Sequence, residues 1–212
     1  MTAIETRNSK IGPIVAEAFK KRHFEAWYYD DPDAAIEAVF SLIPKGHKVS
    51  WGGSMTLIEL GIQDRLEKEG YAVIDRDKAS SPQERGELMR QALLCDTFLT
   101  SSNAISEDGQ LVNIDGYGNR VAAMCFGPRQ VIVVAGINKV VKTLGDAITR
   151  ARTIAAPLNQ QRFPNNKSPC NVTGACADCT APDSVCSQIV TTRLCKPAGR
   201  IKIILIGKNF GM

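Results

Sequence analysis

The chain contains only two histidines, His23 and His47, among its 212 residues. Both stand apart from the serine and cysteine motifs, so no Ser-His-Asp or Cys-His catalytic arrangement is indicated. The longest apolar runs, such as residues 131–135 and 203–206, are too short to cross a bilayer. Residues 1–10 are polar and include Glu5, so they lack the apolar core of a signal peptide. We therefore expect a soluble, cytoplasmic protein without a membrane span.

Runs of lysine and arginine are also missing, and aromatic residues make up only 6% of the chain. A nucleic-acid-binding track is therefore not indicated. The charge is nevertheless divided unevenly. Residues 1–119 carry 13 basic and 19 acidic side chains, whereas residues 120–212 carry 13 basic and only 3 acidic ones. We interpret the excess of positive charge in the second half as an offset to a bound anion.

Helical and extended patterns alternate along the chain. Asp31 followed by Pro32, and Ser81 followed by Pro82 and Glu84, are typical of helix starts. Apolar periodicity predicts helices over about 10–22, 31–42 and 55–67 and from residues 81 and 144, and strands over 27–29, 47–51, 71–74, 97–101, 111–114, 130–135 and 200–206. Strands separated by helices indicate an α/β fold with a mostly parallel sheet and helices on both faces. We expect a single domain over residues 1–212.

A small-residue turn, Gly52-Gly53-Ser54, lies between a predicted strand and a predicted helix. Two glycines let backbone N–H groups approach a ligand, and the start of a helix favours an anion. The alternative is a tight turn in which Ser54 only caps the helix. The turn is neither a Walker loop nor a dinucleotide-binding fingerprint.

Polar residues are also concentrated between residues 102 and 120, in a chain that otherwise looks regular. Asn103, Asp115 and Asn119 exceed what a hairpin turn at Asp108-Gly109 requires, so we expect them to line a pocket. Asn103 and the Gly52-Gly53-Ser54 turn each close a strand, and in a parallel sheet both can lie at the carboxyl edge where ligands bind. Acid–base catalysis by Asp115 is a further alternative.

Five of the seven cysteines fall within residues 170–195. Because no secretory signal is present, a metal site is favoured over disulfides. The four that lie closest together in sequence are the predicted ligands, namely Cys170, Cys176, Cys179 and Cys186. Their irregular spacing favours a 4Fe-4S cluster, with zinc or unligated thiols as alternatives. Cys195 is predicted not to be a ligand, and Cys95 and Cys125 are read as buried small hydrophobic residues.

Three arginines lie close to this cysteine-rich segment, which we place at residues 164–195. Arg150, Arg152 and Arg162 are interpreted as solvated charges, with contact to an anionic ligand as the alternative.

The run from Ser102 to Lys139, including Phe126-Gly127-Pro128 and Gly136-Ile137-Asn138-Lys139, resembles the LUD-domain (lactate utilisation) family, and the likeness covers most of residues 10–155. The resemblance implies a NagB/RpiA/CoA-transferase-like fold whose ligand sits over the strand ends. It also implies an association with iron–sulfur complexes that oxidise lactate. The cysteine-rich segment departs from the shortest family members. No counterpart of the CoA-transferase glutamate nucleophile is evident, since Glu59 and Glu107 lie in ordinary contexts.

Three functions remain open from the sequence, and it does not settle whether the protein is an enzyme. One of them is a non-catalytic regulatory protein that binds a ligand and whose metal site only holds the cysteine-rich loop in place. The leading hypothesis is an iron–sulfur accessory protein or subunit in lactate or related 2-hydroxy-acid oxidation. It would bind a small anionic metabolite and have other iron–sulfur or redox subunits as partners. The alternative is an enzyme that acts on a phosphorylated or CoA-linked small molecule and carries a structural zinc or iron–sulfur site. Assembly into a homo-oligomer stays open.

Overall fold

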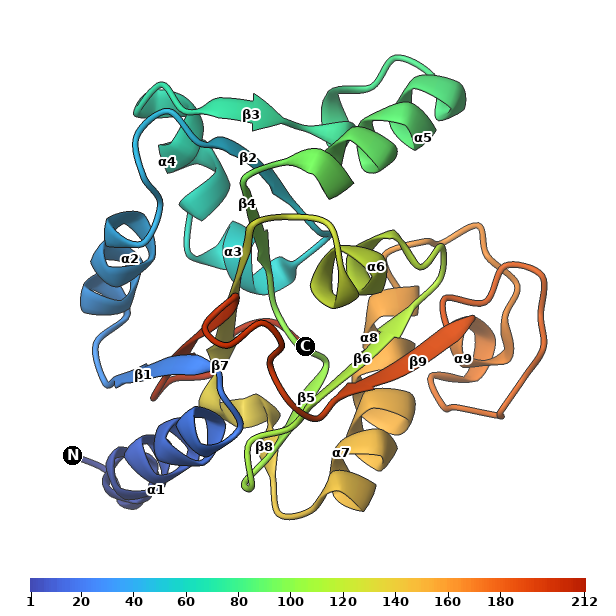
Figure 1. The fold of residues 1–212 in the computed structure, drawn as a ribbon. Coiled ribbons are helices and arrows are strands. Elements are labelled where there is room, and N and C mark those ends of the chain that lie inside the picture. Colours follow the sequence, from blue (N-terminus) through green and yellow to red (C-terminus); the bar gives the residue numbers. More distant parts are fainter.

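A six-stranded parallel sheet forms the centre of the protein in the computed structural model, which describes residues 1–212 (Figure 1). Its strand order is β1 (Glu25–Tyr29), β10 (Ile201–Ile206), β7 (Gln130–Gly136), β4 (Thr97–Thr100), β2 (Lys48–Trp51) and β3 (Ala72–Ile74). Every neighbouring pair is parallel. The predicted parallel α/β fold is therefore confirmed for this sheet.

Helices cover both faces of the sheet. The first face is covered by α1 (Ala3–Lys21), and the second by α2 (Pro32–Ser41), α3 (Met55–Glu59) and α4 (Ile62–Lys68). Successive strand residues point to opposite faces. Val131 and Val133 therefore pack with α1, whereas Ile132 and Val134 pack with α2, α3 and α4. This burial on both faces is why β7 is apolar throughout.

A second sheet, which the sequence did not predict, has the order β8 (Val140–Val141), β5 (Ala104–Ser106), β6 (Leu111–Asp115) and β9 (Gln188–Thr192). Ile105 and Leu111 pack into the core on the α1 face of the first sheet. The opposite side of the second sheet contacts α7 (Leu144–Arg150) and the following π-helical turn (Ala151–Ala155). The strands β5 and β8 are very short, and the side chains of β9 are at most half-buried, so none shows a clear apolar pattern.

Shorter elements complete the chain, and α5 (Pro82–Gln91), with Ser81 as its N-cap, begins where the sequence predicts. The others are α6 (Asn119–Cys125), α8 (Ala156–Gln160), α9 (Pro169–Thr173) and three 3-10 turns at Arg76–Lys78, Ala92–Leu94 and Ile137–Lys139. No helix is both long enough and apolar enough to cross a membrane.

Three local predictions were wrong. The helix expected over 55–67 is interrupted by Gly61, which adopts a left-handed φ of 63° and begins α4. The first helix begins at Ala3 rather than near residue 10, because Thr2 and Glu5 form a capping box. Cys125 is exposed rather than buried, since it lies at the last position of α6.

Candidate functional site

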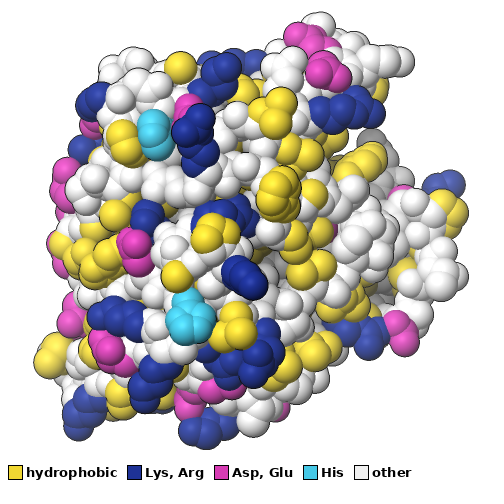
Figure 2. All heavy atoms as spheres, viewed as in Figure 1, with side chains coloured by type: hydrophobic (Ala, Val, Ile, Leu, Met, Phe, Trp, Pro, Cys, Tyr) yellow, Lys and Arg dark blue, Asp and Glu magenta, His cyan; other side chains and the backbone are white.

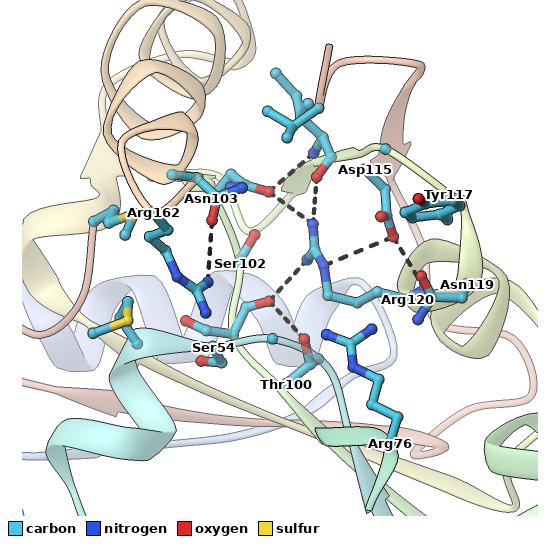
Figure 3. Close-up of a pocket in the computed structure, with 18 of the residues that line it drawn as sticks. Ser54, Arg76, Thr100, Ser102, Asn103, Asp115, Tyr117, Asn119, Arg120 and Arg162 are labelled. Atoms are coloured by element: carbon cyan, nitrogen blue, oxygen red, sulfur yellow. Dashed lines mark hydrogen bonds and ion pairs between the residues drawn. The ribbon is translucent and has the colours of Figure 1, made fainter. Parts of the chain in front are cut away.

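The carboxyl ends of β2 and β4 lie side by side, because these strands are parallel neighbours that pair Trp51 with Leu99. The turn at residues 52–54 and the segment 101–103 therefore meet at one edge of the sheet, as the sequence analysis expected. Lys139, which follows β7, adds to the same edge. These segments border a cavity of about 240 Å³ whose other walls come from β6, α6 and the residues around Arg162 (Figure 3).

Five of the six residues predicted to bind a ligand line this cavity, namely Gly53, Ser54, Asn103, Asp115 and Asn119. Gly52 does not line it and lies against Arg120, where an added Cβ would stand 2.8 Å from Arg120 Cδ. Ser54 also has the structural role that was weighed as its alternative, since its hydroxyl accepts the Leu57 N–H at 3.3 Å and caps α3. The structure thus brings these predicted residues together.

Arg120 ties the two sheets together beneath the cavity. Its guanidinium donates to the Ile114 carbonyl at 2.6 Å, Asn103 Oδ1 at 2.9 Å and the Ser101 carbonyl at 3.2 Å (Figure 3). It also donates to Asn113 Oδ1 at 2.6 Å. Asp115 Oδ2 accepts the backbone N–H groups of Arg120 and Val121. Burial lowers the pKa of Arg120, and Asp115 partly offsets that effect. Asn103 Oδ1 and Asp115 Oδ2 are therefore already bonded within the protein.

Positive charge predominates around the cavity. Four arginines line it (Arg76, Arg85, Arg120 and Arg162), against two acidic side chains, Asp77 and Asp115. Lys and Arg side chains on the surface in Figure 2 are instead scattered among hydrophobic and acidic ones. Because α3 has only five residues, we assign the positive potential to these side chains rather than to a helix terminus.

Among the arginines that line the cavity, Arg76 has a hydrogen-bond donor without a partner. Its Nε is buried and has no hydrogen-bond partner, and the Asp77 carboxylate is 3.9 Å away. Asp77 instead accepts a 2.8 Å hydrogen bond from Arg85. Burial lowers the pKa of Arg76. A buried donor without a partner is destabilising. The guanidinium atom that lies beside Gly53 at the cavity is Nη2.

Lys139 and Arg150 are buried beside the cavity floor, with 4% and 8% of their surfaces exposed. Arg150 donates to the Asn138 carbonyl at 3.1 Å and to the Asn103 carbonyl at 2.5 Å, so the prediction that it is a solvated charge was wrong. Arg76 and Lys139 were not predicted as site residues from the sequence, and Arg120 was included only as the last residue of the polar run 102–120. The available signal for Lys139 was its position three residues after the apolar strand β7.

The predicted cysteine ligands gather elsewhere, around a second cavity of about 70 Å³ that all four line (Cys170, Cys176, Cys179 and Cys186). No cysteine of the chain forms a disulfide. Burial raises the pKa of Cys186, and the other three thiols add to this shift. In this arrangement, no three His, Cys, Asp or Glu side chains form a group that could hold a metal ion. The metal-binding role of the segment therefore stays a prediction.

Cys195 lies apart from these four thiols. It is 2% exposed, packs in the core around α1, and its Sγ accepts the Ile201 N–H at 3.2 Å. Cys95 is buried in the same core, as predicted.

The two cavities share a wall. Val185 lines both of them. Helix α8 also contributes to both, with Pro157 and Gln160 on the cysteine cavity and Asn159 on the cavity at the sheet edge. A Cβ added to Gly116 would stand 3.4 Å from Val185 Cα, so the segment that carries Cys186 packs directly against the wall formed by Asp115 and Gly116.

The fold and site define an α/β domain with a cation-lined cavity at the carboxyl edge of its parallel sheet. The LUD-domain family model matches residues 13–206, so the chain belongs to the LUD-domain family. A crystal structure of a DUF162 family protein from Deinococcus radiodurans is similar with a TM-score of 0.55 and 12% identity, over 94% of this chain and 98% of that one. This likeness shows the fold.

Ribose-5-phosphate isomerase A is similar over about half of each chain. The enzyme from Methanocaldococcus jannaschii has a TM-score of 0.34 and 22% identity over 54% of this chain and 55% of that one. The Neisseria gonorrhoeae enzyme has a TM-score of 0.34 and 15% identity over 53% of each chain. At a TM-score of 0.34, neither match relates this chain to the isomerase in fold or function. No curated protein matches the chain.

Proposed function

We propose that this LUD-domain protein binds a small anionic metabolite in the cavity at the sheet edge and serves in lactate or related 2-hydroxy-acid oxidation. The observation that carries the proposal is the charge of that cavity, which four arginines and only two acidic side chains line. The guanidinium of Arg76, whose Nη2 lies beside Gly53 at the cavity, supports it. Membership of the LUD-domain family supports the connection to lactate utilisation.

The proposed binding position of the anion is beside Gly53. The position that a Cβ of Gly53 would take lies 2.7 Å from Arg76 Nη2 and 3.8 Å from Arg162 Nη1, so two guanidinium groups converge on the space that this glycine leaves open. Guanidinium groups bind carboxylates and phosphates through charge-assisted hydrogen bonds. The Asn103 amide group donates no hydrogen bond within the chain and lines the same cavity, so it can orient the remainder of the ligand.

We further propose that Cys170, Cys176, Cys179 and Cys186 hold a 4Fe-4S cluster, with zinc as the alternative. The placement of all four thiols around one cavity supports this assignment, as does the separate position of Cys195 in the core. When bound, an iron–sulfur cluster would supply one-electron transfer. Val185 in the cysteine-rich segment lines both cavities, so metal binding would also order the wall that they share.

The second candidate function is an enzyme that acts on a phosphorylated or CoA-linked small molecule. One observation favours it. Lys139 lines the anion cavity as a buried amine that lacks an ion-pair partner, which is unusual for a purely structural lysine.

Calorimetric titration tests the anion site, with lactate, pyruvate, inorganic phosphate and coenzyme A as probes. We expect at least one to bind, and Arg76→Gln to weaken that binding about tenfold or more, because one charge-assisted hydrogen bond contributes about 1.5–3 kcal/mol. Arg90→Gln is the matched control, since Arg90 is exposed on α5 and its only ion pair is with Glu87. Equal affinities in the two variants would contradict the proposal.

Absorption of the anaerobically purified protein tests the metal site. We expect broad absorption near about 400 nm for a cubane cluster, whereas zinc gives none. Colourless protein containing one zinc would support the zinc alternative, and colourless protein without metal would refute both assignments.

A further inference from the structure

Lys139 lies in the cavity wall with its amine enclosed by protein. Nζ donates to Ser101 Oγ at 2.8 Å and to Thr56 Oγ1 at 3.0 Å, and it forms no other hydrogen bond or ion pair. Only 4% of the residue is exposed, so bulk water cannot solvate the nitrogen freely. A lysine in this setting lacks both of the usual ways of stabilising an ammonium charge, a carboxylate partner and water.

The number of hydrogen bonds matches the neutral amine. An ammonium group has three N–H donors and would leave one unsatisfied here, whereas a neutral amine has two N–H donors and one lone pair. The two hydroxyl acceptors account for both donors and leave the lone pair free. The amine is therefore held in a form that can act as a nucleophile.

The surrounding charges favour the same form. Arg150 on α7 and Arg120 on α6 place positive charge near the amine, and Glu59 on α3 is the carboxylate that opposes them. Burial, together with these two arginines, lowers the pKa of Lys139 to about 7. Desolvation and neighbouring cations are the means by which lysine amines become nucleophilic near neutral pH.

We propose that Lys139 is a catalytic residue that forms an imine with the carbonyl group of a small anionic substrate, a ketone or aldehyde that also carries a carboxylate or phosphate. This inference rests on the anion site proposed above and specifies the substrate class of that site. Arg76 and Arg162 at Gly53 would hold the anionic group, and Lys139 lines the same cavity. Lactate oxidation yields a 2-oxo acid, which has this combination of groups.

The reaction needs no oxidant or additional reactant. The Nζ lone pair forms a bond to the carbonyl carbon, and the carbonyl π electrons move to oxygen, which is protonated as the nitrogen loses a proton. The hydroxyl of the resulting carbinolamine takes up a proton and leaves as water while the nitrogen lone pair forms the C=N bond. The nitrogen then releases its remaining proton, which balances the proton taken up by the hydroxyl. Ser101 and Thr56 are within hydrogen-bond distance of Nζ and can relay the proton.

Borohydride trapping tests the proposal on the full chain. The protein is incubated with pyruvate, or with glycolaldehyde phosphate, and then reduced, and the modified peptide is identified by mass spectrometry. We expect one adduct per chain, on Lys139, and none at this position in Lys139→Arg. Lys142→Arg is the control, because Lys142 is exposed and pairs with Glu107 outside the cavity, and it should keep the full adduct yield. A carboxylate substrate predicts trapping with pyruvate, and a phosphorylated one predicts trapping with glycolaldehyde phosphate.

The outcomes separate this inference from the proposed function. Absence of a Lys139 adduct with both probes overturns the imine proposal, and so does labelling spread equally over surface lysines. If the protein still binds phosphate or pyruvate by calorimetry in that case, the anion site stands and only the role of Lys139 is wrong. If no anion binds at all, both proposals fail.

Discussion

Replacing Gly53 tests the proposed anion-binding position without substituting a charged residue. A Cβ at this position would stand 2.7 Å from Arg76 Nη2, which is closer than real Cβ contacts. The obstructing atom is the far end of a flexible side chain, and Gly53 does not have a left-handed φ. Gly53→Ala should therefore displace the guanidinium and leave the fold intact, whereas Gly53→Val adds two methyl groups in the space of the anion.

The expected loss of affinity follows from this displacement. Restoring an ordinary contact moves Nη2 by about 1 Å, which breaks a hydrogen bond of normal length to a ligand. Losing one charge-assisted hydrogen bond costs about 1.5–3 kcal/mol, so Gly53→Ala should weaken anion binding roughly 10- to 100-fold. Gly53→Val should abolish detectable binding. Stability should change by less than about 1 kcal/mol, since no core group is removed.

Calorimetry with the tightest anion, together with thermal unfolding and metal analysis, measures these effects. Gly145→Ala is the matched control, because its Cβ would meet only Thr143 Oγ1 at 3.7 Å, far from the cavity. This variant should bind as the unmodified protein does, and the metal content of all variants should be unchanged. An unaltered affinity in Gly53→Val would refute the reasoning and show that the glycine serves only the turn.

The remaining predictions concern the cysteines and Lys139. Cys176→Ser should lose the metal and Cys195→Ser should keep it, as measured by metal analysis, and full retention in Cys176→Ser would contradict the ligand assignment. Chelation should make residues 164–195 sensitive to protease while the sheet stays folded, and should weaken anion binding by calorimetry because the cavities share Val185. Simultaneous unfolding of the whole chain would show instead that the site belongs to the core. Burial lowers the pKa of Lys139 to about 7 in the folded protein, whereas the unfolded chain keeps the ordinary lysine value. Between about pH 7 and pH 10 the unfolded state therefore binds more protons than the folded state. The free energy of unfolding should rise across this range by up to about 1.4 kcal/mol per pH unit. Denaturant titrations across this range should show a shallower rise for Lys139→Met, and identical slopes would contradict the lowered pKa.

Much of the main sheet was predictable because its elements carry local signals. The β7 strand is buried on both faces and reads as a continuous apolar run. The caps at Asp31 and Ser81 mark helix starts through side chains that bond the first turn. The second sheet lacked such signals, since β9 is at most half-buried and β8 has only two residues, so its pairing depends on contacts distant in sequence.

The candidate site was predictable only where backbone geometry requires a particular residue type. The glycines and asparagines that close strands were recognisable from the sequence, and the parallel pairing of β2 with β4 places them together. Arg76 was not recognisable, because it follows a short strand, β3, within a charged stretch typical of a surface turn. The missing partner of its Nε is a property of the packed cavity.

The sequence by itself determined the alternation that builds a parallel sheet, the small-residue turn at Gly53 and the grouping of four cysteines. These features depend on residues near one another along the chain. Only the tertiary structure decided that Lys139 is a buried amine between two hydroxyls, and that Val185 lines both the cysteine cavity and the cavity at the sheet edge. The ionisation of a side chain depends on its burial and on the charges around it. Here those come from α3, α6 and α7, which only the folded chain brings together.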